Sequence, residues 1–247
     1  MMDLSRQNPD WKDPLLCQSW ELTDNEGTGM KFTFHPIRLF STLHLFADGT
    51  FLYTTTDSIY PGKWIHDQED IVLQFQNTRI TLSIRKVSEE KLKVFIRKNY
   101  QSQEITFSSD GIVHKNPEND PWYPANNTWR IKPQAPESNG QIKERIKNYL
   151  HFFSLFLRDN KKRDKSIVDW RGIPTVIGFY SNGISLYQAD KIEDAWYNCF
   201  YSDDQAMTAY NMIKGVMDNK SINCKDDSQG WVMLDACFLE GVYSEIK

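Results

Sequence analysis

The sequence contains no long apolar run. Nowhere do about 18 consecutive apolar residues occur, the length that a membrane-spanning helix needs. The first residues, MMDLSRQNPDWKDP, include acidic residues and proline where a secretory signal would have basic residues and then an apolar segment. We therefore expect neither membrane association nor export.

Cysteine is scarce and widely spaced. The four cysteines, Cys17, Cys199, Cys224 and Cys237, form no CxxC pair. Zinc sites and disulfide-rich small folds depend on closely spaced cysteines, and cytosolic proteins keep their thiols reduced. The sequence therefore predicts four reduced thiols, serving as small core residues, in a cytoplasmic protein.

Catalytic motifs are also missing. The sequence contains no GxSxG, HExxH, P-loop or GxGxxG pattern. In the carboxy-terminal part, His151 is the one imidazole that could activate a cysteine. The other histidines could converge on a metal, but their spacing is not that of ligands: His35, His44, His66 and His114. We predict no catalytic residue, no metal site and no cofactor.

Composition indicates a folded protein of two domains. A hydrophobic fraction of 40% and eight tryptophans supply a core. The 247 residues suffice for two domains, since domains cluster at about 100 to 150 residues. The net charge of −4 argues against nucleic acid binding, because phosphate contacts need a basic surface.

The clearest structural signal runs through residues 42–75. Apolar residues occupy alternate positions on both sides of the turn Ala47-Asp48-Gly49. Such period-two segments joined by a glycine predict a β-hairpin. The segments 62–66 and 71–75 extend it into an antiparallel meander.

Further segments present one apolar face each: 17–23, 30–34, 79–86, 91–97, 103–107 and 112–114. The last two read as a hairpin around Asp110-Gly111. Eight or so short strands at this spacing predict a closed or nearly closed antiparallel barrel, because closure removes unpaired edges.

The amino-terminal half resembles the lipocalin-like domains found in bacterial proteins. The resemblance rests on Trp20 in the first strand, on Asp48-Gly49-Thr50-Phe51, on Gly62-Lys63-Trp64, and on the strands at 71–73 and 91–94. It covers residues 17–114 and implies a β-barrel that carries a small hydrophobic ligand. An eight-stranded barrel either fills itself with side chains or holds one such ligand, and the sequence leaves both open.

Residues 116–140 contain five of the ten prolines. Proline fits neither a helix interior nor a central strand, so we expect a barrel at 1–115, a connector at 116–140 and an α+β domain at 141–247. Three aromatic residues, Trp122, Tyr123 and Trp129, predict a connector packed against one or both domains. Residues 128–132 could add an edge strand.

Two helices are predicted in the second domain. Ser138 and Gln141 have the capping-box spacing, and apolar residues recur at helical spacing up to position 158, which predicts one buried stripe. Ser202 and Gln205 repeat the spacing before a second helix. Residues 231–246 read as a final helix or as a strand.

Strands are predicted at 167–170, 175–180, 184–187 and 195–201. Asn182-Gly183 joins two of them and is a strong hairpin signal. The fold class is therefore α+β overall, with a lipocalin-like antiparallel barrel followed by a smaller α+β domain.

Asp169, Trp170 and Arg171 form a candidate ligand site. A guanidinium beside an indole could hold an anionic ligand, and a site using Asp169 and Arg171 at the domain junction is the enzyme alternative. An internal Asp–Arg pair that fixes a strand end is the other interpretation.

Charge is unevenly distributed in the second domain. Residues 141–165 contain eight Lys or Arg against three Asp or Glu, whereas residues 166–247 contain six against twelve. The acidic part includes a candidate partner-binding surface: Asp190, Glu193, Asp194, Trp196, Tyr197, Asp203 and Asp204. Aromatic rings within a charged rim suit a protein interface, although a solvated face over an aromatic core has the same composition.

From these observations we expect a non-catalytic binding protein. One version is an immunity-type protein that covers a basic partner protein with its acidic aromatic surface. The alternatives are a carrier of a small hydrophobic ligand inside the barrel, and an enzyme with its site at the domain junction.

Overall fold

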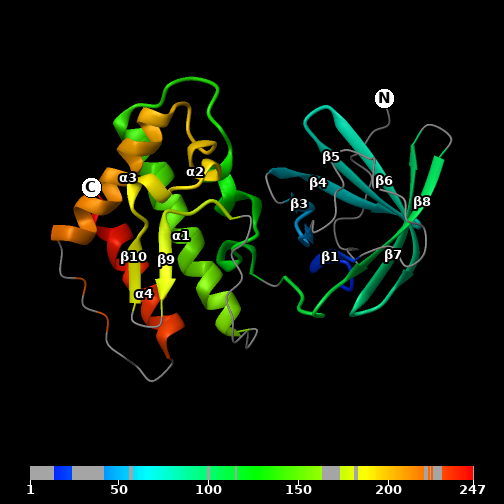
Figure 1. Ribbon diagram of the computed structural model, residues 1–247. Coiled ribbons are helices and arrows are strands. Elements are labelled where there is room, and N and C mark those ends of the chain that lie inside the picture. The colour runs from blue at the N-terminus through cyan, green and yellow to red at the C-terminus, as the bar shows by residue number, and fades with distance from the viewer. Residues whose placement is uncertain are drawn as a thin grey trace. The chain divides into compact units, whose positions relative to one another are not determined.

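The computed structural model describes residues 14–23, 42–55, 58–98, 101–114, 116–162, 173–180, 183–219, 222, 224 and 230–246. The chain divides into two compact units, Met1–Pro117 and Glu118–Lys247. Strands form the first unit, and the second is mainly helical with one small sheet (Figure 1). The predicted α+β class is confirmed.

The first unit is a closed antiparallel barrel of eight strands, as predicted. Each strand pairs with the next in sequence and β8 pairs with β1, so the sheet has no open edge. The strands are β1 (Ser19–Thr23), β2 (Thr42–Leu45), β3 (Thr50–Thr54), β4 (Ile59–Asp67), β5 (Asp70–Phe75), β6 (Thr78–Val87), β7 (Lys91–Lys98) and β8 (Gln101–Ser108).

The predicted last hairpin is wrong. β8 already has β7 and β1 as neighbours, so no edge remains for residues 112–114, and Val113 makes only an isolated bridge to Gln18. The predicted strand at 30–34 lies outside the described residues.

Alternate residues of the strands fill the barrel with large side chains. Trp20 and Phe51 are 0% exposed and Trp64 is 1% exposed. The indole of Trp64 donates to the Phe46 carbonyl at 2.8 Å. Opposite Phe51, Gly62 leaves room for the ring: a Cβ there would lie 2.6 Å from the Phe51 Cε1.

The second unit is built around helix α1 (Asn139–Lys162). The predicted single buried stripe is too narrow, because every residue from Tyr149 to Leu157 except His151 is buried. A helix that is apolar on most sides must be covered on most sides. The 3-10 helix η3 (Pro124–Arg130), α3 (Asp203–Asn219) and α4 (Trp231–Glu245) pack against it.

Smaller elements complete this unit. β9 (Ile177–Tyr180) and β10 (Gly183–Leu186) form the predicted antiparallel hairpin. Two short helical segments are η4 (Ala189–Lys191) and α2 (Asp194–Tyr197), while η2 (Pro117–Asn119) spans the boundary between the two units. The predicted strand at 167–170 lies outside the described residues, and the helical alternative for 231–246 is correct.

Two predicted strands are helical instead. At 195–201 the chain forms α2 and a following turn, because Trp196, Cys199 and Phe200 are buried at the helical spacing of three and four residues. At 128–132 the chain finishes η3, where the Asn127 amide donates to the Pro121 carbonyl at 2.6 Å.

The first capping box is present and the second is only half formed. Ser138 N donates to Gln141 Oε1 at 2.8 Å, and Gln141 N donates to Ser138 Oγ at 3.4 Å. In the second, Gln205 N donates to Ser202 Oγ at 3.4 Å. The Gln205 side chain instead pairs with the backbone of Glu137, donating to its carbonyl at 2.6 Å.

The prediction of four reduced thiols is wrong. Cys224 and Cys237 form a disulfide with Cα atoms 6.0 Å apart, whereas Cys17 and Cys199 are free and buried. The disulfide removes the observation on which the cytoplasmic assignment depended. Among the helices of the described residues, none has the length and apolar character needed to cross a membrane.

Candidate functional site

Large side chains of the described residues fill much of the barrel interior. A cavity among them has a volume of about 10 Å³. That is about the minimum for one water molecule, and small-ligand pockets are typically about 300–1,000 Å³. The cavity is lined by Leu43, Phe51, Tyr53, Leu73, Phe75, Ile80, Leu82 and Phe107. Around this cavity the described residues of the barrel form a packed hydrophobic core.

A serine between two histidines joins parts of the barrel that are distant in sequence. Ser19 Oγ lies 2.8 Å from His44 Nδ1 and 3.1 Å from His114 Nε2. A hydroxyl beside an imidazole is the pairing that a nucleophile requires. Both rings are buried, however, and no residue of this group lines either described cavity. The group links β1 and β2 to the segment that follows β8.

Cys199 is not an activated nucleophile. Its side chain is buried and Sγ donates to the Ala195 carbonyl at 3.4 Å. Burial raises the pKa of Cys199 to about 11, although the nearby positive charges of Arg130 and Arg145 act to lower it. The thiol is therefore neutral near pH 7, and only a thiolate is a strong nucleophile.

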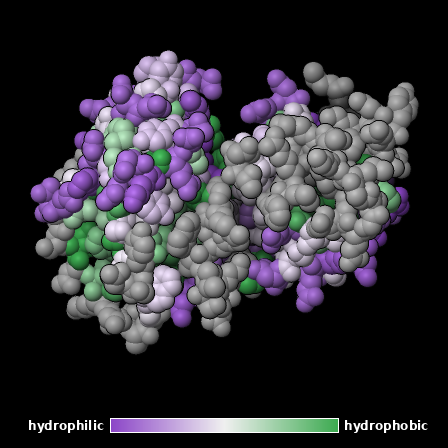
Figure 2. Space-filling view, viewed as in Figure 1, coloured by the Kyte–Doolittle hydropathy of each residue, from purple (hydrophilic) through white to green (hydrophobic). Residues whose placement is uncertain are grey.

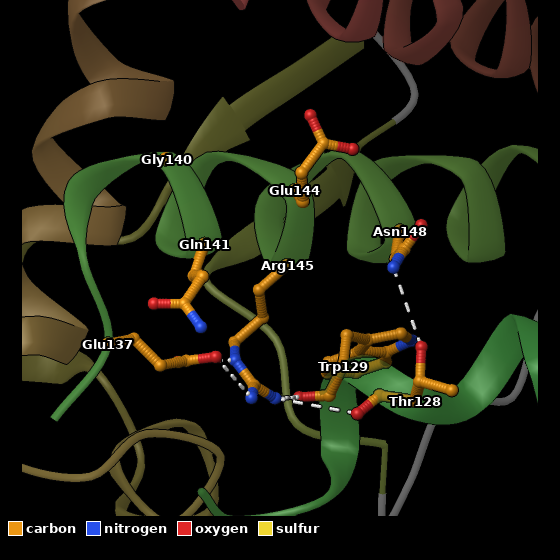
Figure 3. Close-up of a pocket in the computed structure, with 8 residues that line it drawn as sticks. All are labelled: Thr128, Trp129, Glu137, Gly140, Gln141, Glu144, Arg145 and Asn148. Atoms are coloured by element: carbon orange, nitrogen blue, oxygen red, sulfur yellow. Dashed lines mark hydrogen bonds and ion pairs between the residues drawn. The ribbon is translucent and has the colours of Figure 1, made fainter. Parts of the chain in front are cut away.

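A second hollow, of about 320 Å³, lies in the second unit between η3 and the start of α1 (Figure 3). Its lining residues are Thr128, Trp129, Glu137, Gly140, Gln141, Glu144, Arg145 and Asn148. In Figure 3 the Arg145 side chain extends from α1 toward Glu137 on one side and the η3 backbone on the other.

Arg145 uses its donors within the protein. Nε and Nη2 each donate to a carboxylate oxygen of Glu137 at 2.8 Å, a bidentate pair. Nη1 donates to the carbonyls of Trp129 at 2.8 Å and Ile131 at 3.0 Å. Since the side chains of the ion pair are only 12% and 13% exposed, we interpret this group as a structural clasp that joins η3, the chain before α1, and α1 itself.

Asp235 is a buried carboxyl group on α4. It is 2% exposed, and its Oδ2 has no hydrogen-bond partner among the described residues. Burial raises the pKa of Asp235 to about 6. The folded protein therefore keeps a proton here that the unfolded chain releases at lower pH.

Replacing Asp235 with asparagine should stabilise the protein at pH 7.5 by about 1–3 kcal/mol. Below the unfolded-state pKa of about 3.9, Asp235 is protonated in both states and does not destabilise the fold. The stability of the wild-type protein then falls as the pH rises from there to about 6. Urea unfolding of both proteins at pH 4 and pH 7.5 measures this. A stability difference that is the same at both pH values would contradict the assignment.

The predicted ligand residues Asp169, Trp170 and Arg171 lie outside the described residues. Of the predicted partner-binding residues, Asp190, Glu193, Asp194, Asp203 and Asp204 are all exposed. Tyr197 is partly buried, with its hydroxyl 3.5 Å from Met207 Sδ. Trp196 is 0% exposed and donates to the Ala206 carbonyl at 3.2 Å, so its side chain offers no exposed area to a partner.

Two features of the second unit were not predicted as site residues. Tyr201 is 42% exposed, and the only signal for it was its place among acidic residues in sequence. The pairing of Arg145 with Glu137 had no sequence signal, because an eight-residue separation across a helix start matches no local motif.

The five exposed carboxylates form no side-chain hydrogen bond or ion pair with other described residues, in contrast to Glu137 and Glu240, which pair with arginines. Figure 2 shows hydrophilic residues gathered over the part of the second unit where Figure 1 places α2 and α3. Part of this charge has a local role, because Asp203 and Asp204 occupy the first turn of α3.

Among the residues that the structure describes, no group of three or more His, Cys, Asp or Glu residues could hold a metal ion. The chain was also compared with known proteins. No family model, curated protein or solved structure matches it.

Proposed function

We propose that this chain is a non-catalytic binding protein that holds a basic partner protein at an acidic surface of its second unit. The acidic surface consists of Asp190, Glu193, Asp194, Asp203 and Asp204 together with Tyr197 and Tyr201. In one specific version the chain is an immunity-type protein and the partner is a basic toxin.

The observation that carries the proposal is the unpaired state of these five exposed carboxylates among the described residues. Lys191 is the one basic residue between positions 188 and 207. A field of one sign accelerates encounter with an oppositely charged protein. Tyr201, 42% exposed, supplies a ring of the kind that anchors interfaces.

We further propose that the barrel is lipocalin-like in its fold but serves as a scaffold instead of a carrier. The filled interior supports this choice over the carrier alternative, because a cavity of about 10 Å³ is far smaller than a ligand pocket. The junction-enzyme alternative depends on Asp169 and Arg171, and no described residue adds to it.

The test begins with capture of partners by the full chain from an extract of the cells that produce it. The partner is then purified and its affinity measured by calorimetry. Neutralising three carboxylates together, by Asp190→Asn, Glu193→Gln and Asp194→Asn, should weaken binding by about tenfold or more, and added salt should weaken wild-type binding.

A matched control neutralises three exposed carboxylates of the barrel, by Glu69→Gln, Glu89→Gln and Glu90→Gln. This variant has the same net charge and should bind as the wild type does. Equal weakening by both triple variants, or no stoichiometric partner in the extract, would overturn the proposal.

A further inference from the structure

We propose that the disulfide between Cys224 and Cys237 is a redox-controlled clamp. While intact, it holds Ile222 and Cys224 against helix α4, and its reduction releases that contact.

Two contacts define the clamp. Cys224 is bonded to Cys237, and the Ile222 side chain covers Gly241 so closely that a Cβ at Gly241 would collide with it. Cys237 and Gly241 are four residues apart on α4 and so lie on the same face.

The two contacts follow one another along α4. Four helical residues rise by about 6 Å, so Ile222 contacts α4 about one helical turn beyond the disulfide. Gly241 is the position that lets Ile222 approach.

The covalent contact is the stronger of the two. Ile222 is only partly buried, so its packing alone holds the chain weakly. Both Cys224 and Cys237 are partly exposed, which makes the disulfide accessible to small thiols. Cys17 and Cys199, by contrast, are 2% exposed.

The chemistry is thiol–disulfide exchange with a low-molecular-weight thiol. One thiolate attacks a sulfur of the pair and forms a mixed disulfide, and a second thiolate displaces the remaining protein sulfur. The protein disulfide gains two electrons and two protons to become two thiols, while the reagent becomes its own disulfide. An oxidising environment closes the clamp and a reducing one opens it.

The test uses the full chain in its oxidised form and after treatment with dithiothreitol. Thiol alkylation in denaturant, followed by mass spectrometry, should find two free cysteines before reduction and four after it. Hydrogen exchange of the α4 amides should accelerate by about tenfold or more on reduction, since closing a loop of this size stabilises strongly, while exchange in the barrel strands stays unchanged.

The double variant Cys224→Ser, Cys237→Ser should exchange like the reduced wild type and show no further response to dithiothreitol. If this variant does not fold, the reduction of the wild-type protein still tests the clamp. Four free thiols in protein purified without reductant, or equal α4 exchange before and after reduction, would overturn the proposal.

Discussion

Replacing Arg145 with methionine is expected to destabilise the second unit by about 3–5 kcal/mol, the usual effect of removing one partner of a buried ion pair. The change leaves the Glu137 carboxylate with no cation and the carbonyls of Trp129 and Ile131 without their donor. Urea unfolding followed by the helical circular dichroism signal measures the change.

Lys147 provides the control on the same helix. Its ion pair with Glu144 joins side chains that are 27% and 70% exposed, and such pairs contribute about 0–1 kcal/mol. Lys147→Met should therefore change little. If Arg145→Met proves no more destabilising than Lys147→Met, the clasp interpretation is wrong.

The second large effect is expected in the barrel. Trp64→Ala should cost about 3–5 kcal/mol, because a buried tryptophan loses its packing and leaves a cavity. The Phe46 carbonyl would also lose its indole donor. Hydrogen exchange of the barrel strands in increasing urea separates this loss from unfolding of the second unit.

Trp231 offers a matched control, since it is a tryptophan that is 42% exposed at the start of α4. Trp231→Ala should lie within about 0.5 kcal/mol of the wild type, as is usual for surface positions. Similar losses in Trp64→Ala and Trp231→Ala would show that the Trp64 ring is not part of a packed core.

The barrel could be predicted because its signals are local. Leu43, Leu45, Phe51 and Tyr53 alternate along β2 and β3, and the glycine at position 49 adopts the positive φ of 80° that its turn needs. A short range of sequence contains both the inward face and the turn. Whether the interior was filled depended on how rings from different strands meet, as Phe51 of β3 and Phe75 of β5 do.

The second unit was harder to predict because its contacts join distant segments. The short helix at Trp196 was read as a strand, although Trp196, Cys199 and Phe200 have helical spacing. Gln205 leaves its expected capping role because Glu137, 68 residues away, offers backbone partners. The disulfide likewise depends on how Cys224 comes to lie against α4, which no spacing of cysteines encodes.

The most direct measurement is a titration of the wild-type protein with a fluorescent fatty acid, because the proposed function places binding on the surface and leaves no room for a ligand in the barrel. We expect no saturable signal, since the cavity of about 10 Å³ cannot admit an acyl chain. Saturable one-to-one binding that a non-fluorescent fatty acid displaces would contradict the filled barrel and restore the carrier alternative.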